Sequence, residues 1–250
     1  MNIAIRFGIL VLAGVPLLGA CASGGPQFSQ MTADSTFQHA TNELAAGDWD
    51  DAIQAFQQFT FQFPSDPRYQ EARFRLGEAY FGKGEFVTAA SEFDRLASDF
   101  PSGEYAPEAR LKVCESYAEL SPGPQRDQQY TESAIDHCES LISFYPRSPQ
   151  VARAQQIIGE MRDKLAEKMF RTGEFYRNRL KAYDSAVQYF NDTLVAYPES
   201  SIVPKVLFSL WETYVELGYE TEANEVRERL IREHSATDEA KRIQVVSRDD

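Results

Sequence analysis

Cysteine and histidine are scarce in this 250-residue sequence, and their spacing gives little support to catalysis or metal binding. There are three of each, and His39, His137 and His234 lie far apart. No C-x-x-C, H-E-x-x-H, G-x-S-x-G or Gly-rich phosphate loop occurs. His137 and Cys138 are adjacent, but neighbours on one helix point in different directions, so we do not expect a nucleophile pair. The sequence predicts no catalytic residue, no cofactor and no metal ligand.

Cys21 is the cysteine whose surroundings indicate a specific chemistry. It follows residues 1–20, which carry one positive charge at Arg6 and a twelve-residue apolar run over Phe7–Leu18. That run is shorter than a bilayer about 30 Å thick requires, and it is typical of a secretory signal peptide. The tripeptide Leu-Gly-Ala then precedes Cys21 in the order of a bacterial lipobox. There the thiolate is the nucleophile that takes up a diacylglycerol, so we expect lipidation at Cys21. The alternative is a plain signal peptide with an incidental cysteine.

Residue Ala22, directly after Cys21, predicts where such a lipoprotein is sorted. In lipoproteins of Gram-negative bacteria, a residue other than Asp at this position usually directs the protein to the outer membrane. Residues 21–34 then read as a flexible tether, because they are rich in Gly, Ser, Pro and Gln and show no periodicity.

The composition limits the partners of the chain. Lys and Arg number 25 against 38 Asp and Glu, which gives a net charge of -13. Nucleic acids and anionic lipid head groups are bound through surplus Lys and Arg, so this balance argues against both. Hydrophobic residues make up 43% of the chain, which is enough for a folded core rather than disorder.

The elements that must position any site form a repeat. Gly, an aromatic residue, Ala, Phe and Pro recur at the same spacing in Gly47–Pro64 and Gly84–Pro101. Weaker copies end at Pro146 and Pro198, and a fifth runs over Trp211–Leu230. The pattern resembles the tetratricopeptide repeat, in which glycines can end first helices and prolines second helices. Neither helix can bury its apolar face alone, so we predict an all-α superhelical solenoid of about five tetratricopeptide-like helix–turn–helix repeats.

Uneven repeat lengths predict the organisation of the solenoid. Ser121–Asp127 is an inserted loop within the third repeat, and Pro149–Leu180 reads as one helix of roughly 30 residues that bends at Gly159 or Gly173. The predicted parts are a three-repeat block over 35–148, the linking helix with a two-repeat block over 149–235, and a charged tail over 236–250.

Cys114 and Cys138 fall on the two helices of the third repeat, at positions that pack against each other. They are either two buried thiols that act as small hydrophobic residues, or a disulfide that an oxidising compartment permits. Both interpretations stay open at this point.

A solenoid of this kind presents a concave groove lined by its first helices, which suits an extended peptide or a partner helix. The expected groove residues of the first two repeats are Phe37, Thr41, Leu44, Phe74, Glu78 and Phe81, with Arg73 and Arg75 nearby. Aromatic rings beside cations would suit a C-terminal aromatic residue with a free carboxylate. The plainer interpretation is that Phe74 and Phe81 belong to the core.

Lipobox, tether, repeats and linking helix together resemble the BamD-like lipoproteins of the outer-membrane β-barrel assembly machinery, over about residues 33–235. The most specific segment is Arg162–Ala166, followed by Phe175-Tyr176 and Tyr197-Pro198. The resemblance implies a cofactor-free protein on the periplasmic face of the outer membrane. It implies that the N-terminal repeats bind unfolded outer-membrane proteins through a C-terminal aromatic signal, and that the C-terminal repeats dock on the barrel-forming insertase.

Met169 departs from that family, whose members tend to carry an acidic residue there. The alternative function is a lipidated tetratricopeptide scaffold or pilotin for another envelope machine, such as a secretin or a cell-division complex. Such pilotins lack the long linking helix, and the cell-division proteins with similar repeats are not usually lipidated.

Overall fold

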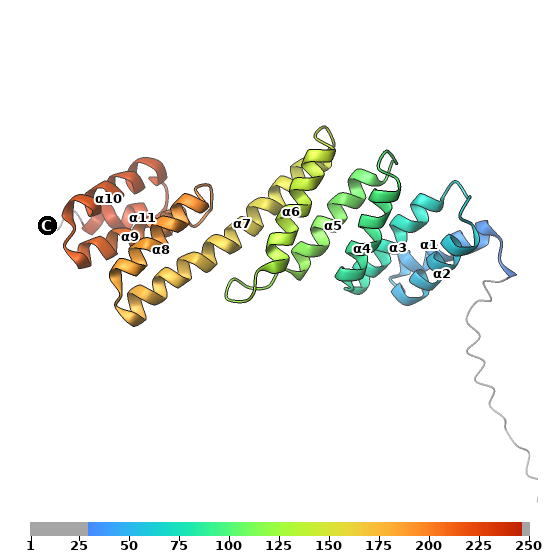
Figure 1. The fold of residues 1–250 in the computed structure, drawn as a ribbon, viewed down its shortest axis with the longest axis horizontal. Helices are drawn as coiled ribbons and strands as arrows, with labels where there is room; N and C mark the ends of the chain where they lie inside the picture. The colour runs from blue at the N-terminus through green and yellow to red at the C-terminus, as the bar shows by residue number, and fades with distance from the viewer. Residues whose placement is uncertain (1–29, 247–250) are drawn as a thin grey trace, which may run out of the picture.

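The computed structural model describes residues 30–246, so Cys21, the signal peptide and most of the predicted tether lie outside the described residues. The described chain is helical from end to end and contains no strand (Figure 1). Its elements are α1 (Ala33–Ala46), α2 (Trp49–Gln62), α3 (Tyr69–Lys83), α4 (Phe86–Asp99), α5 (Ala106–Leu120), α6 (Gln129–Phe144), α7 (Gln150–Phe175), the π-helical turn η2 (Tyr176–Leu180), α8 (Tyr183–Ala196), α9 (Val203–Leu217), α10 (Glu220–His234) and α11 (Asp238–Val246). Consecutive helices pack in antiparallel pairs, and the predicted all-α solenoid is confirmed.

Glycine and proline end the helices as predicted. Gly47, Gly84 and Gly218 follow α1, α3 and α9 in the left-handed conformation, with φ between 74° and 83°. Each donates its backbone N–H back to the last turn of the helix, which satisfies free carbonyl groups there. The second helices α2, α4, α6 and α8 all end two residues before a proline. These stops fix where one repeat gives way to the next.

In the second and fourth repeats the two helices meet at a similar joint, where a glycine on the first helix faces a phenylalanine on the second. In the second repeat these residues are Gly77 and Phe93, and in the fourth they are Gly173 and Phe190. A Cβ atom on either glycine would come within 2.6 Å of the facing ring. Both phenylalanines are fully buried. The missing side chain therefore lets the backbone of the first helix rest on the ring.

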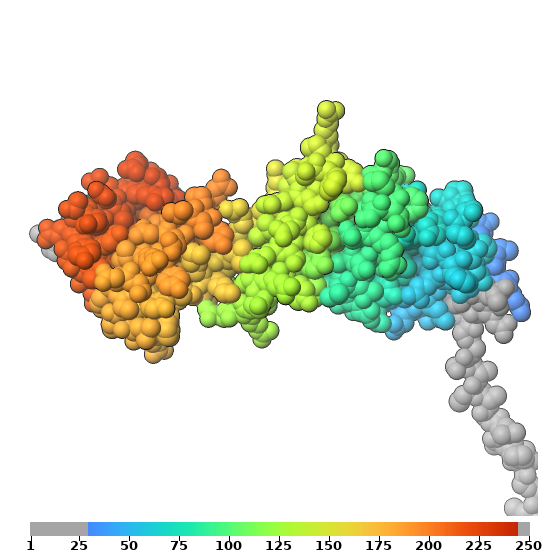
Figure 2. Space-filling view, viewed as in Figure 1, coloured from blue at the N-terminus to red at the C-terminus, as the bar shows by residue number. Residues whose placement is uncertain are grey.

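Helix α7 joins the two blocks of the solenoid. Its first half packs against the third repeat through Ala154, Ile157 and Met161, and its second half packs through Phe170 into the C-terminal core. Figure 2 shows the molecule narrowing where α7 crosses between the blocks. The α-helix is unbroken through Gly159 and Gly173 and is followed by the π-helical turn η2, after which Lys181 has a φ of 53°.

The ends of the described chain extend the solenoid further than the sequence indicates. Helix α1 begins at Ala33, inside the predicted tether, and Met31 packs on the first core. Within the predicted charged tail, α11 buries Ala240 and Ile243 completely in the C-terminal core. Charged residues surround this apolar stripe in the sequence, so the sequence did not predict a helix there. None of the helices between residues 30 and 246 has the length and apolar character that a membrane crossing requires.

Candidate functional site

A hollow of about 330 Å³ lies on the first-helix face of the N-terminal repeats. We name it the first hollow; it is lined by Leu44, Trp49, Arg75, Glu78, Phe81, Gly82 and Lys112. These residues come from α1, α2, α3 and α5, so three successive repeats build it. The hollow has aromatic walls beside cations. A peptide end that carries an aromatic side chain and a carboxylate would complement both features.

Local structure explains the aromatic walls of the first hollow. Trp49 is the first residue of α2, and its indole rests on the backbone of α3 at Gly82, where a Cβ atom would come within 2.8 Å of the ring. Phe81 stands beside it and meets Phe86 edge-on, with ring centroids 5.1 Å apart. The Lys112 Nζ atom lies 5.2 Å from the centre of the Phe81 ring, within the range of a cation–π contact.

The cations of the first hollow are already paired with carboxylates of their own helices. Arg75 Nη1 donates to Glu78 Oε2 at 2.8 Å, and its Nε lies 3.7 Å from Glu71 Oε1. Lys112 Nζ donates to Glu115 Oε2 at 2.9 Å. Burial lowers the pKa of Arg75, but Glu78 and Glu71 outweigh it and raise the pKa, so the guanidinium stays charged. An incoming carboxylate would exchange with these partners rather than meet a bare charge.

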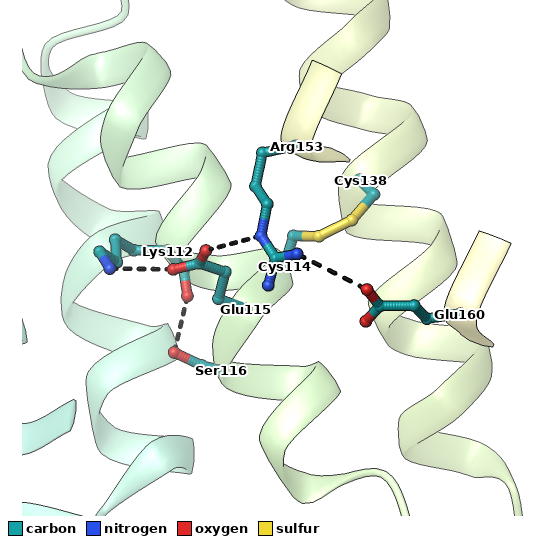
Figure 3. Close-up of a disulfide and its surroundings, with 7 residues drawn as sticks. All are labelled: Lys112, Cys114, Glu115, Ser116, Cys138, Arg153 and Glu160. Carbon is teal, nitrogen blue, oxygen red and sulfur yellow. Dashed lines mark hydrogen bonds and ion pairs between the residues drawn. A yellow bond between two sulfur atoms is a disulfide. The ribbon is translucent and has the colours of Figure 1, made fainter. Parts of the chain in front are cut away.

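A second hollow of about 590 Å³ continues the groove toward the linking helix. It is lined by Phe81, Glu115, Ala118, Glu119, Ser121, Arg153, Ile157, Glu160, Met161 and Lys164. Arg153 on α7 lies 3.5 Å from Glu115 on α5, so this ion pair joins the two helices, and it also lies 3.6 Å from Glu160 of its own helix (Figure 3). Phe81 lines both hollows, which therefore adjoin, and we call the two together the groove.

The structure brings together four of the eight predicted groove residues. Leu44, Arg75, Glu78 and Phe81 all line the first hollow. Three residues that the prediction omitted complete it, namely Trp49, Gly82 and Lys112. A signal for Trp49 was present, because it occupies the repeat position of Phe86, where an aromatic ring recurs.

Phe74 and Arg73 are not groove residues, and their prediction is corrected. Phe74 is only 5% exposed and packs against Phe93 and Tyr105, with centroids 5.4 and 5.3 Å apart. Arg73 is 6% exposed and donates to Asp99 at 2.6 Å. Both side chains face α4, and Phe74 also meets Tyr105 before α5, so the plainer interpretation of Phe74 as core is the right one.

Phe37 and Thr41 lie away from both hollows. The Phe37 ring packs edge-on against Phe59 at 5.3 Å and is covered by the Arg68 guanidinium at 4.9 Å. The Thr41 hydroxyl donates to the Phe37 carbonyl of its own helix. Neither side chain contributes to the lining of the groove.

Cys114 on α5 and Cys138 on α6 are joined as a disulfide, with Cα atoms 5.2 Å apart (Figure 3). Both residues are fully buried. Cys114 stands between Lys112 and Glu115, whose side chains line the groove. Among residues 30–246, no group of three or more His, Cys, Asp or Glu side chains is arranged to hold a metal ion.

Fold and groove together define a class: a tetratricopeptide-like solenoid with an elongated groove. Within that class, the chain belongs to the family described as "YfiO: Outer membrane lipoprotein", which matches residues 29–230. The resemblance stated from the sequence is confirmed by this match.

Relatives with assigned names agree with the family. The outer membrane protein assembly factor BamD of Caulobacter vibrioides is 24% identical over 196 residues, covering 78% of this chain and 64% of its own length. The assembly factor of the same name from Haemophilus influenzae is 22% identical, covering 88% of this chain and 87% of its own. This chain thus spans slightly less than two thirds of the Caulobacter protein. Among solved structures, the TPR2AB domain of yeast Sti1 is 14% identical with a TM-score of 0.45, over 87% of this chain and 84% of that one.

Proposed function

We propose that this chain is a non-catalytic assembly factor for outer-membrane proteins, and that its groove holds an extended segment of an unfolded client. Family membership and the names of the relatives support the general role. The observation that carries the specific proposal is the first hollow, where Trp49 and Phe81 stand beside Arg75 and Lys112. The client feature that fits is a terminal aromatic residue with a free carboxylate.

The expected affinity is moderate. An aromatic side chain buried between Trp49 and Phe81 contributes about 1.5–3 kcal/mol. The client carboxylate replaces Glu78 and Glu115 as the acceptor of hydrogen bonds that Arg75 and Lys112 donate, so it adds specificity more than affinity. A client that binds in this way can also be released, as an assembly factor requires.

Binding can be followed through Trp49, which lines the hollow. For this experiment, the substitution Trp211→Phe is introduced into the full-length chain, which is kept in detergent. Trp49 is then its remaining tryptophan. A ten-residue peptide that ends in Phe with a free carboxylate should change Trp49 fluorescence at micromolar concentration, and its C-terminal amide should bind about tenfold more weakly. Arg75→Gln should abolish the difference between acid and amide, whereas Arg95→Gln on the exposed face of α4 should preserve it.

Equal binding of acid and amide by the parent chain would refute the carboxylate site. Loss of the difference in both arginine variants would also refute it, since Arg95 lies outside the groove.

We further propose that Cys21 is lipidated and anchors the chain to the periplasmic face of the outer membrane, with the C-terminal repeats docked on the barrel-forming insertase. Affinity purification from detergent-solubilised outer membrane should recover that insertase in stoichiometric amount. Recovery of a secretin or a cell-division protein in its place would favour the scaffold or pilotin alternative. Cys21→Ala should move the chain to the soluble fraction.

A further inference from the structure

The disulfide occupies the joint that the second and fourth repeats close with a phenylalanine. In the second repeat, Gly77 faces Phe93, 16 positions later. In the third repeat, Cys114 faces Cys138, 24 positions later, because the loop after α5 is longer. The residue that the second helix contributes, Phe93 in one joint and Cys138 in the other, is fully buried. The third repeat thus combines the longer connection with a covalent link between its two helices.

The sulfur atoms are sealed behind the linking helix. Cys114 and Cys138 share a core with Ala154, Ile157 and Met161 of α7, and every one of these residues is at most 3% exposed. An enzyme or small oxidant needs in-line access to a sulfur atom for thiol–disulfide exchange. In the packed structure that access is blocked, so the bond must form before α7 closes over the hairpin of α5 and α6.

We propose that this chain is a client of a thiol–disulfide oxidoreductase, which oxidises Cys114 and Cys138 while α7 is still undocked. One thiol loses its proton and attacks the disulfide of the oxidoreductase, which forms a mixed disulfide and releases one thiolate of that enzyme. The second cysteine, also deprotonated, then attacks the mixed disulfide. The chain has lost two protons and two electrons, and the oxidoreductase leaves as a dithiol.

The sequence simplifies this oxidation. Cys21 is the only other cysteine of the 250 residues. Once lipidated as proposed above, it is a thioether and cannot compete, so one pairing remains. An oxidoreductase that joins cysteines is then sufficient, and no isomerase is needed to correct wrong pairs.

The disulfide also fixes the position of α5, which contributes residues to the groove. Helix α5 carries Lys112 and Glu115 on either side of Cys114, and Arg153 of α7 pairs with Glu115 across the second hollow. A third repeat that closed without the bond would leave α5 free to shift against α7. This consequence rests on the proposed peptide-binding function, whereas the order of oxidation and docking does not.

The order of events can be tested without any peptide. The full-length chain in detergent is oxidised and then treated with dithiothreitol, with or without urea, and free thiols are counted with a maleimide that adds mass. We expect reduction to be at least 100-fold faster in urea. Conversely, chain that was reduced and refolded without oxidant should react with an oxidised thiol–disulfide oxidoreductase slowly, and rapidly once α7 is released.

The variant Ile157→Asp should release α7 from the hairpin of α5 and α6 without urea, because it places a charge in the buried core around the disulfide. Glu160→Gln, on the exposed side of the same helix, is its control. Faster oxidation in the Ile157→Asp chain alone supports the proposal. Equal rates in all three chains, or rapid reduction of the native disulfide, would overturn it. Peptide binding by the oxidised chain, measured separately, reports on the proposed function alone.

Discussion

The second and third repeats close the same joint by different means. Gly77 and Phe93 meet through shape alone, since the ring occupies the space that a side chain on Gly77 would fill. Cys114 and Cys138 occupy the equivalent positions and are joined covalently. The first joint is stabilised by burial of an aromatic ring, and the second by a bond that also restricts the unfolded chain.

This difference shows that a repeat protein can vary how one joint is stabilised without altering its neighbours. Contacts in a solenoid are made only between adjacent repeats, so each joint is stabilised locally. The phenylalanine joint needs only the correct sequence, whereas the disulfide joint also needs an oxidising compartment. The third repeat therefore connects folding of this chain to the compartment in which it is made.

Exchanging one joint for the other gives the largest expected effect. Cys114→Ala with Cys138→Ala should reduce the free energy of unfolding by about 3 kcal/mol, because a bond that closes a 24-residue loop is lost. Cys114→Gly with Cys138→Phe recreates the second-repeat joint and should recover most of that loss. Urea denaturation of both variants beside the oxidised parent measures the two differences. If the Gly–Phe pair were no better than the Ala pair, the two joints would not be equivalent.

A smaller effect is expected at the glycine of the phenylalanine joint. Gly77→Ala brings a methyl group within 2.6 Å of the buried Phe93 ring, and overpacking of this kind costs about 1–3 kcal/mol. Gly159→Ala on α7 is the matched control, because no atom lies within 4 Å of the added Cβ. Alanine favours a helix over glycine by roughly 0.5–1 kcal/mol, so this control should be stabilised. A lower melting temperature for Gly77→Ala and a higher one for Gly159→Ala would confirm the close approach. A change in the same direction for both variants would contradict it.

The sequence predicted the parts of the fold that repeat. Spacing of glycine and proline gave the helix ends, and the alignment of Cys114 with Gly77 placed the two cysteines at one joint. It could not predict η2 or α11, because neither recurs. The π-helical turn depends on how α7 meets α8, and the buried stripe of α11 includes Ala240 and Ile243, which stand among charged residues in the sequence.

The groove was predicted less completely for a physical reason. Successive residues of α3 turn about 100° each, so Phe74 and Arg75 point to different neighbours although they are adjacent in sequence. The repeat pattern identifies α3 as a first helix but does not say which of its apolar residues faces the next repeat. Lys112 and Arg153 come from later repeats, and they reach the groove only because the successive helices pack side by side.

The contact between α7 and the fifth repeat uses a third device, a carboxylate that caps a turn. Asp163 accepts hydrogen bonds from the Ser200 hydroxyl at 2.6 Å and from the Ser201 backbone and hydroxyl at 3.0 and 2.6 Å. Burial raises the pKa of Asp163, but the hydrogen bonds from Ser200 and Ser201 outweigh it and hold the pKa below its ordinary value. The charged form is therefore the one that stabilises this contact.

Asp163→Asn should give the smallest effect, a loss of about 1 kcal/mol at pH 7. Because the folded-state pKa is depressed, the contribution of Asp163 is complete above the ordinary carboxyl pKa of about 4 and disappears as the pH falls through the folded value. The variant and the parent should thus differ in urea denaturation at pH 7 and converge at lower pH. Asp192→Asn, at an exposed position of α8, should have the same free energy of unfolding as the parent at pH 7 and at the lower pH. A difference that persisted in acid would mean that shape, and not charge, makes this contact.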